Sequence, residues 1–194
     1  KVLQVRAFFL HNTYMNIKNH YLENIKISAS PNFDIRPKDK EISLIVLHSI
    51  SLPPTIFGNN YVEDFFLNKL SKSKNEYINK IRSMKVSSHL YIKRTGEIIQ
   101  FVSFDKRAWH AGKSIYEGIE NCNDYSIGIE LEGCDDISFE NIQYIKLSEI
   151  INTLIVNYQY LRKDRIVSHS DIAPGRKSDP GPLFDWKRLK TMIK

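Results

Sequence analysis

The stretch "ISLIVLHSISLPP", residues Ile42 to Pro54, joins a run of branched apolar residues to a histidine and then to a proline pair. The six residues of 42–47 are typical of a buried β-strand. Proline cannot continue a strand in the middle of a sheet, because it lacks a backbone donor. The stretch therefore predicts a core strand that ends near His48, where the imidazole can reach a cleft.

A second histidine follows the same kind of strand near the C-terminus. The segment "RIVS" (Arg165–Ser168) predicts a short strand, and His169 comes directly after it. Three of the chain's seven prolines and two of its eight glycines then fall within residues 174–182. Such a segment can be neither a helix nor a central strand. We expect a stiff loop that holds Asp179 against His169.

The remaining pattern alternates between helices and strands. Apolar residues at helical spacing predict helices, a Thr-Gly turn predicts a hairpin, and strict alternation predicts a further strand. The helices are expected at 61–81, 142–158 and 184–194, the hairpin at 89–102 and the strand at 125–131. This order indicates an α/β fold: a single domain with a mixed central β-sheet flanked by helices.

Length and composition agree with one globular domain. The chain has 194 residues, of which 42% are hydrophobic and 26% charged. Residues 28–194 are expected to form the domain, after an N-terminal extension at 1–27. Because the chain starts with Lys1 rather than Met, we interpret the segment before Met15 as partly non-native. The apolar run 7–10 is shorter than the roughly 7–15 residues of a signal peptide, so we expect a cytoplasmic protein that does not engage a membrane.

The chain carries 28 Lys and Arg against 22 Asp and Glu, a formal charge of +6. A basic charge favours anionic partners. The lysines are spread along the chain and no nucleic-acid-binding motif is present, so we expect no nucleic-acid partner. Cys122 and Cys134 do not form a CxxC pair, and we expect both to be free thiols.

The two strand-end histidines and the loop aspartate can form a metal site. A catalytic zinc typically takes three protein ligands and keeps a fourth position for water. His48, His169 and Asp179 supply such a set, but His89 and His110 compete as ligands. A core role for the histidines and a loop-capping role for the aspartate also explain the spacing, so spacing alone leaves both readings open.

Four stretches together are more specific: "IVLHSISLPP", "VSSHLYIKRTGEIIQFVSFDKRAWHAG", "CNDYSIGIELEG" and "SHSDIAPGRKSDPGPLFDW". They resemble the successive motifs of the zinc N-acetylmuramoyl-L-alanine amidases, and more narrowly the AmpD type. Amidases of that type cleave anhydromuramyl peptides in bacterial peptidoglycan recycling. The resemblance runs from about Ser30 to Trp186 in the order of the family motifs.

The resemblance implies a role for each motif residue. His48, His169 and Asp179 match the ligands of one catalytic zinc ion. Glu130 matches the family's catalytic glutamate, a choice over Glu132 that strand alternation cannot make. Lys177 matches the catalytic lysine, and Trp109 and His110 match residues that line the substrate cleft. Ser49 and Lys85 are further substrate-binding candidates. His89 is implied to be either a structural residue or one that supports the zinc ligands without binding the metal.

Three positions depart from the family pattern, and all three bear on how anionic substrate groups are held. Ser49 stands in place of the usual asparagine, Lys85 in place of arginine, and Asn121 in place of a basic residue. The resemblance implies that residues 28–194 form a zinc amidase domain. The sequence does not determine its oligomeric state, and we expect a monomer in the cytoplasm. Its substrate would be the amide between (anhydro)N-acetylmuramic acid and L-alanine of muropeptides. Two alternatives are a peptidoglycan-binding module and an amidase that acts on intact cell wall.

Overall fold

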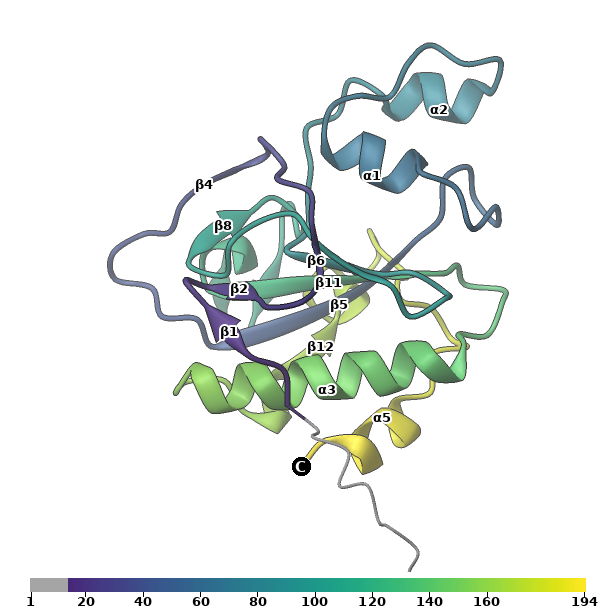
Figure 1. Cartoon of the computed structure of the whole chain (residues 1–194). Coiled ribbons are helices and arrows are strands. Elements are labelled where there is room, and N and C mark those ends of the chain that lie inside the picture. The colour runs from purple at the N-terminus through teal and green to yellow at the C-terminus, as the bar shows by residue number, and fades with distance from the viewer. Residues whose placement is uncertain (1–13) are drawn as a thin grey trace, which may run out of the picture.

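A six-stranded mixed sheet forms the centre of the protein (Figure 1). The structure is a computed structural model that describes residues 14–194. Every pairing in the sheet is parallel except that of β6 with β7, which is antiparallel, so the sheet is mixed as predicted. In spatial order the strands are β12 (Ile166–Ser168), β5 (Leu44–Ile50), β11 (Ser126–Glu132), β6 (Leu90–Ile92), β7 (Ile98–Gln100) and β3 (Lys26–Ile27).

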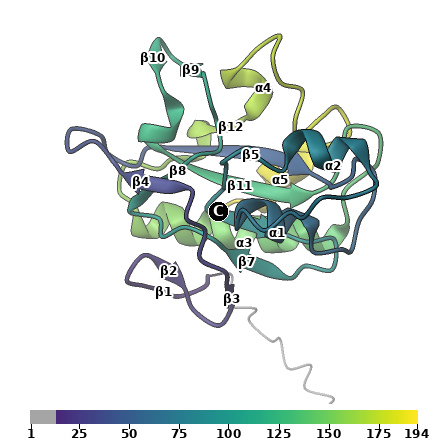
Figure 2. The same ribbon diagram turned by 90° about the horizontal axis from the view of Figure 1, so that it is seen from above.

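Helices cover both faces of this sheet (Figures 1 and 2). The long helix α3 (Asn141–Asn157) and the C-terminal α5 (Trp186–Met192) lie on one face, and α1 (Tyr61–Phe66) and α2 (Glu76–Ile81) lie on the other. The short α4 (His169–Ile172) follows β12 directly. Three small pairs complete the strands: β1 (Ile17–Lys18) with β2 (Tyr21–Leu22), β4 (Phe33–Ile35) with β8 (Lys106–Ala108), and β9 (Ile115–Tyr116) with β10 (Ile119–Glu120).

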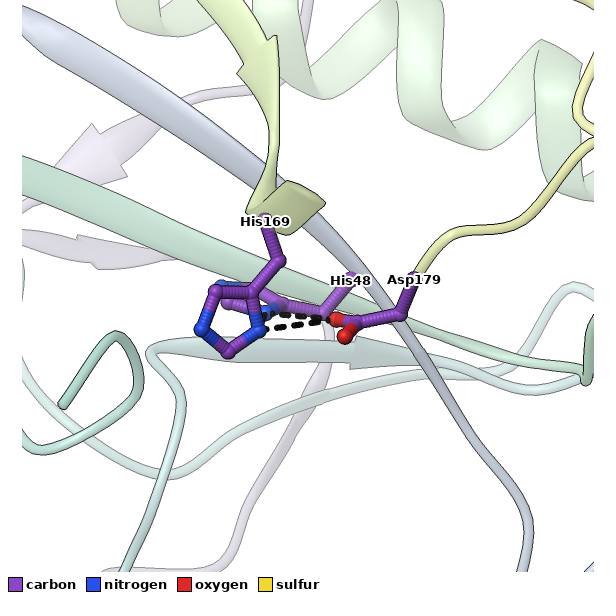
Figure 3. A group of neighbouring side chains, drawn as sticks. All are labelled: His48, His169 and Asp179. Carbon is purple, nitrogen blue, oxygen red and sulfur yellow. Dashed lines mark hydrogen bonds and ion pairs between the residues drawn. The ribbon is translucent and has the colours of Figure 1, made fainter. Parts of the chain in front are cut away.

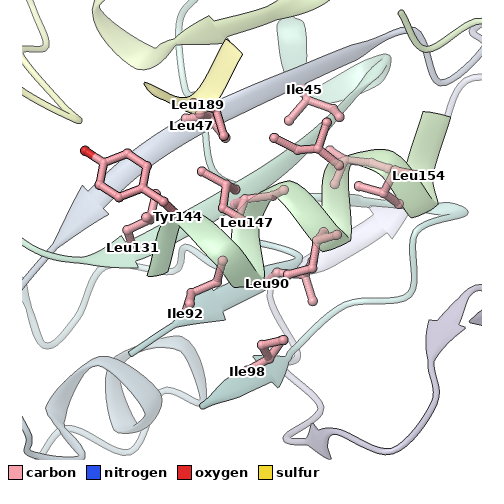
Figure 4. Packing of buried hydrophobic residues seen from close by; sticks show 14 of the residues in the cluster. Ile45, Leu47, Leu90, Ile92, Ile98, Leu131, Tyr144, Leu147, Leu154 and Leu189 are labelled. Atoms are coloured by element: carbon pink, nitrogen blue, oxygen red, sulfur yellow. The ribbon is translucent and has the colours of Figure 1, made fainter. Parts of the chain in front are cut away.

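The main core lies between the sheet and α3 (Figure 4). Successive side chains of a strand point to opposite faces. The apolar residues of β11 therefore share the face that packs on α3, and β5 contributes two more. They are Ile127, Ile129 and Leu131 of β11 and Ile45 and Leu47 of β5, all fully buried. The alternate residues of both strands point away from this core.

The parallel register of β5 and β11 brings two of those alternate residues together. His48 is paired with Glu130 across the two strands, close to their carboxyl ends. Ligand sites of open α/β sheets occur at the carboxyl ends of the strands. The local sequence and the register thus place an imidazole and a carboxyl group side by side at that edge.

Most of the predicted elements are confirmed, with one exception. The hairpin forms between β6 and β7, and Gly96 occupies its turn with a φ of +85°. The single helix expected over 61–81 is wrong, because the chain breaks it into α1 and α2. Asn68 takes a left-handed φ of +59°, and Asn75 then starts α2 by accepting hydrogen bonds from two backbone N–H groups. Helical spacing of the apolar residues did not reveal this break.

The segment expected to be an extension packs on the domain from residue 15 onward. The Met15 N–H donates to Thr153 Oγ1 at 2.8 Å, and Leu22 is buried in the main core. Residues 26–27 form β3, the edge strand of the central sheet. Strands of two residues are too short to show alternation, so the sequence gives no sign of these contacts. The remainder of the expected extension, at 1–13, lies outside the described residues.

Across residues 14–194, no helix combines the length and the apolar character that crossing a bilayer requires.

Candidate metal centre and active site

Three side chains from three separate elements converge at the carboxyl edge of the sheet (Figure 3). His48 comes from β5, His169 is the first residue of α4, and Asp179 lies on the loop rich in proline and glycine. The two Nδ1 atoms are 2.9 Å apart, and Asp179 Oδ2 lies 3.1 Å from the Nδ1 of His48 and 2.9 Å from that of His169. The structure therefore brings together the three residues that the motifs predict as ligands.

Local hydrogen bonds set the direction of His169 and of the loop. Ser168 caps α4, since its Oγ accepts from the Asp171 N–H at 2.9 Å and Asp171 Oδ2 accepts from the Ser168 N–H at 2.8 Å. This capping box ends β12 and turns His169 toward the cleft. The Asp179 carbonyl accepts from the Ser170 N–H at 3.1 Å, which fastens the loop to the first turn of α4.

The donor set fits a metal ion. His169 Nε2 donates to the Ala111 carbonyl at 3.1 Å, so its Nδ1 keeps a lone pair that faces the Asp179 carboxylate. Acceptors this close to one another are best satisfied by a shared cation. Two imidazoles and one carboxylate, all within 4.8 Å, match the ligand types of a catalytic zinc site. This set can therefore hold a metal ion.

The protonation states agree with metal binding. Burial lowers the pKa of His48 to about 4. Burial by itself would raise the pKa of Asp179, but its close contacts with the His169 and His48 imidazoles outweigh burial and hold that pKa well below its usual range. Metal ligands must be deprotonated. A neutral imidazole and an ionised carboxylate therefore already face each other at neutral pH.

Glu130 is the buried carboxyl group of the site. It is 8% exposed, and its Oε2 has no hydrogen-bond partner among residues 14–194. Burial raises the pKa of Glu130 well above its usual range, the Asp179 charge raises it further, and Lys177 opposes both. A buried carboxyl with a raised pKa at the wall of a cleft is suited to accept and release a proton.

Glu132 differs from Glu130, although it lies on the same face of β11. Its Oε1 accepts from the Gly58 N–H at 2.6 Å and its Oε2 from the Arg94 N–H at 2.9 Å. Both oxygens therefore hold backbone loops. The structure thus separates the two glutamates that alternation leaves equivalent.

The third histidine of the sequence candidates, His89, lies away from the ligand set. Its Nδ1 accepts from the Gly128 N–H at 3.0 Å, and its Nε2 lies 3.0 Å from the Lys106 carbonyl. Both ring nitrogens are engaged inside the protein. His89 is therefore a structural residue rather than a ligand.

The ligand set opens into a cleft of about 240 Å³. Ser49, Trp109 and His110 line it together with Glu130 and Lys177. Apolar residues also line the cleft, and the sequence indicates them only through the helical spacing of Phe65, Tyr77 and Ile81, without showing that they face the site. They are Ile50, Leu52, Phe65, Phe66, Tyr77, Ile81, Met84 and Val86.

The last substrate candidate, Lys85, does not line this cleft. It lies in the adjoining hollow, which shares Trp109 and Lys177 with the cleft and also includes Arg176. The structure thus gathers eight of the nine predicted site residues around one cleft and places the ninth beside it.

A mixed α/β sheet carries a histidine–histidine–aspartate set that can hold a metal ion and a buried glutamate that can transfer a proton, an arrangement suited to metal-assisted hydrolysis. The N-acetylmuramoyl-L-alanine amidase family matches residues 38–182, and the chain belongs to this family. The family predicted from the four motifs is confirmed.

Known relatives resemble the chain over most of its length. The 1,6-anhydro-N-acetylmuramyl-L-alanine amidase AmpD of Haemophilus influenzae is 48% identical over 179 residues, which is 92% of this chain and 97% of that protein. The crystal structure of a selenomethionine derivative of AmpD superposes with a TM-score of 0.90 at 43% identity, covering 93% of this chain and all 100% of the other.

A more distant structure contains a bound substrate. It is the Escherichia coli amidase AmiD in complex with anhydro-N-acetylmuramic acid-L-Ala-D-γ-Glu-L-Lys. AmiD superposes with a TM-score of 0.58 at 28% identity, over 92% of this chain and 65% of that one. The predicted fold class is confirmed by these structures.

Proposed function

We propose that the protein is a zinc-dependent amidase that hydrolyses the amide between anhydro-N-acetylmuramic acid and L-alanine. One observation carries this proposal: the unpartnered carboxyl oxygen of Glu130 lies beside the converging set of His48, His169 and Asp179. Hydrolysis of an amide needs an activated water and a group that delivers a proton to the leaving nitrogen. The site offers residues suited to both tasks.

His48, His169 and Asp179 would hold the zinc ion. When bound there, zinc supplies a water that is acidic enough to react at neutral pH and polarises the scissile carbonyl. Glu130 takes the proton of the attacking water on its free oxygen and delivers it to the nitrogen of the departing L-alanine. Its raised pKa suits this role, because it makes the Glu130 carboxylate a stronger base than an exposed glutamate.

Lys177 provides positive charge for the transition state. It lines the cleft beside Asp179, two residues along the same loop. The carbonyl oxygen of the amide becomes negative when water attacks it, and an ammonium group at that point stabilises the charge. A lysine on an exposed loop often does no more than form a surface ion pair, but none joins Lys177 to an acidic group among the pairs described within residues 14–194.

Ser49, Trp109 and Lys85 are proposed to contact the muropeptide. Ser49 and Trp109 line the cleft, and Lys85 lies in the adjoining hollow, where a peptide carboxylate would meet its positive charge. His110 differs from these three, because both its ring nitrogens are hydrogen-bonded to protein atoms. The net charge of +6 favours a soluble anionic substrate.

Two further features concern where and how the enzyme works. Cys122 and Cys134 are unpaired, which suits a reducing compartment, and we infer that the protein acts in the cytoplasm. A single chain supplies all three ligands, Glu130 and Lys177, so the site needs no second subunit, which is consistent with the monomer that we propose.

Product analysis tests the proposed reaction. The protein is incubated with an anhydromuramyl tripeptide or with intact murein, each with and without a chelator, and the products are identified by mass spectrometry. We expect free tripeptide and anhydro-N-acetylmuramic acid from the soluble substrate, and no reaction with the chelator. Faster release from intact murein would show a cell-wall amidase instead, and binding without cleavage would show a recognition module.

A further inference from the structure

The "WHAG" segment of Trp109–Gly112 contacts both candidate histidine ligands on the side of each ring that faces away from Asp179. His110 Nδ1 lies 2.9 Å from His48 Nε2, and the Ala111 carbonyl accepts from His169 Nε2 at 3.1 Å. Each of these contacts uses the ring nitrogen that does not face Asp179. One short segment therefore contacts the outer ring nitrogen, Nε2, of each of the two imidazoles.

The donor and the acceptor in each hydrogen bond of the series His48–His110–Ser126–Cys122 can be assigned by starting from its last member, the Cys122 carbonyl. The Ser126 hydroxyl lies 2.5 Å from the Cys122 carbonyl, which can only accept, so Ser126 uses its single proton there. His110 Nε2, 3.1 Å from Ser126 Oγ, must then be the donor in that contact. A neutral His110 consequently accepts at Nδ1, and the proton between the two rings belongs to His48 Nε2.

This arrangement fixes the tautomer of His48. With its proton on Nε2, the Nδ1 of His48 carries a lone pair directed at Asp179 and His169. That is the form an imidazole needs in order to bind a metal through Nδ1. A fixed hydrogen bond on the outer nitrogen also holds the plane of the ring.

The segment itself is held rigidly. Asn123 Oδ1 accepts from the backbone N–H groups of His110 and Ala111, at 3.2 and 2.8 Å. Arg176 Nη2 donates to the Ala111 carbonyl at 2.7 Å. Gly128 leaves room for the imidazole of His110, since a Cβ at that position would lie 2.4 Å from its ring.

We propose that His110 is a positioning residue that holds His48 in its metal-binding tautomer through the chain His48–His110–Ser126–Cys122 carbonyl. The Ala111 carbonyl does the same for His169. The inference rests on the proposed metal site. It gives His110 a role in orienting a metal ligand rather than in binding substrate. Loss of such an outer contact typically weakens metal binding by about 10- to 100-fold.

Two substitutions at one position test this role. In His110→Leu the chain of hydrogen bonds is broken while an apolar side chain fills the space. In His110→Gln the amide retains one acceptor and one donor that can bridge His48 and Ser126. Trp109→Leu serves as the matched control, because Trp109 lines the same cleft without contacting a ligand. Zinc affinity is measured by competition with a chromogenic chelator, and folding by circular dichroism.

We expect zinc affinity to fall by about 10- to 100-fold in His110→Leu, to recover largely in His110→Gln and to stay unchanged in Trp109→Leu. Imidazole ¹H–¹⁵N spectra of the metal-free wild type should show His48 protonated on Nε2, which needs no variant to fold. Unchanged zinc affinity in His110→Leu, or a proton on His48 Nδ1, would overturn the role of His110. Absence of zinc binding by the wild type would instead overturn the metal site itself.

Discussion

Glu130 and Glu132 show how much the surroundings of a residue decide its chemistry. Both lie on the same face of β11 and both are nearly inaccessible to solvent. Glu132 accepts backbone hydrogen bonds on both oxygens, whereas Glu130 keeps one oxygen free beside the ligand set. An ionised Glu130 has too few hydrogen-bond donors around it to compensate for the loss of water on burial. It therefore costs stability and gains reactivity.

Replacing Glu130 by glutamine should separate these two effects. Glu130→Gln should retain zinc but lose about 10²–10⁴ in kcat, because the proton acceptor is gone. Because the pKa of Glu130 is raised, the folded state binds the Glu130 proton more tightly than the unfolded chain does. The stability that this proton gives the folded state is lost progressively as the pH rises above about 4.5. At pH 7 the metal-free variant should therefore melt above the metal-free wild type.

The matched control is Glu132→Gln, which keeps the free carboxyl of Glu130 and disturbs only the loop contacts. It should melt below the wild type and keep most of its turnover. Steady-state kinetics, zinc content and thermal unfolding of both variants decide between the two glutamates. Near-normal turnover in Glu130→Gln would rule out its role in proton transfer.

Among the secondary-structure elements, the alternating pattern of the sequence predicts strands, but it does not predict which strands pair with each other. Alternation in β11 indicates that Ile127, Ile129 and Leu131 share one face, whereas the apolar run of β5 indicates only a buried strand. Nothing in either segment shows that His48 is paired with Glu130, because the register depends on contacts between distant parts of the chain. The same limit applies to β3, whose two residues join the sheet only through their partner strand.

The close approach of β11 to the "WHAG" segment gives a prediction at this scale. Gly128→Ala should displace the His110 imidazole, since the added Cβ would lie 2.4 Å from its ring. We expect both a lower melting temperature and weaker zinc binding, because overpacking a buried site typically costs about 1–3 kcal/mol. Thermal unfolding and chelator competition measure the two effects. Wild-type zinc affinity in Gly128→Ala would contradict the packing described here.

For the whole molecule, buried histidines couple stability to pH. Burial lowers the pKa of His48 to about 4 and that of His89 to about 3, and it holds the pKa of His110 well below its usual range. In the unfolded chain each of these groups binds a proton near pH 6.5. The unfolded state thus takes up more protons as the pH falls below 6.5, and folding is destabilised. Glu130 opposes this trend with a single proton.

The metal-free protein should therefore lose stability on acidification from pH 7 to pH 5. Each proton that the unfolded chain binds and the folded protein does not lowers the free energy of unfolding by about 1.4 kcal/mol per pH unit. The effect of three histidines exceeds the opposite effect of one glutamate. The zinc-loaded protein should lose more, because its ligands must remain deprotonated. Urea unfolding at both pH values, with and without zinc, measures the difference. A metal-free protein that is more stable at pH 5 than at pH 7 would contradict the histidine environments described here.

The candidate site could be predicted more fully than the fold that holds it. His48, His169 and Asp179 were accessible from motifs, although spacing alone left His89 and His110 as competitors. The structure removes His89 because both its nitrogens are engaged elsewhere. No pattern in the sequence could show that the "WHAG" segment lies behind the ligands, since that contact depends on Asn123 and Arg176 from other parts of the chain.

The most direct test of the proposed enzyme is the turnover of an anhydromuramyl tripeptide during stepwise restoration of zinc. The purified protein is stripped with a chelator, dialysed and titrated with zinc while release of free tripeptide is followed. We predict no turnover in the stripped protein and full recovery at one zinc ion per chain, with no recovery in His169→Ala at the same zinc concentration. Full turnover by the stripped protein, or by His169→Ala, would contradict a zinc amidase built on His48, His169 and Asp179.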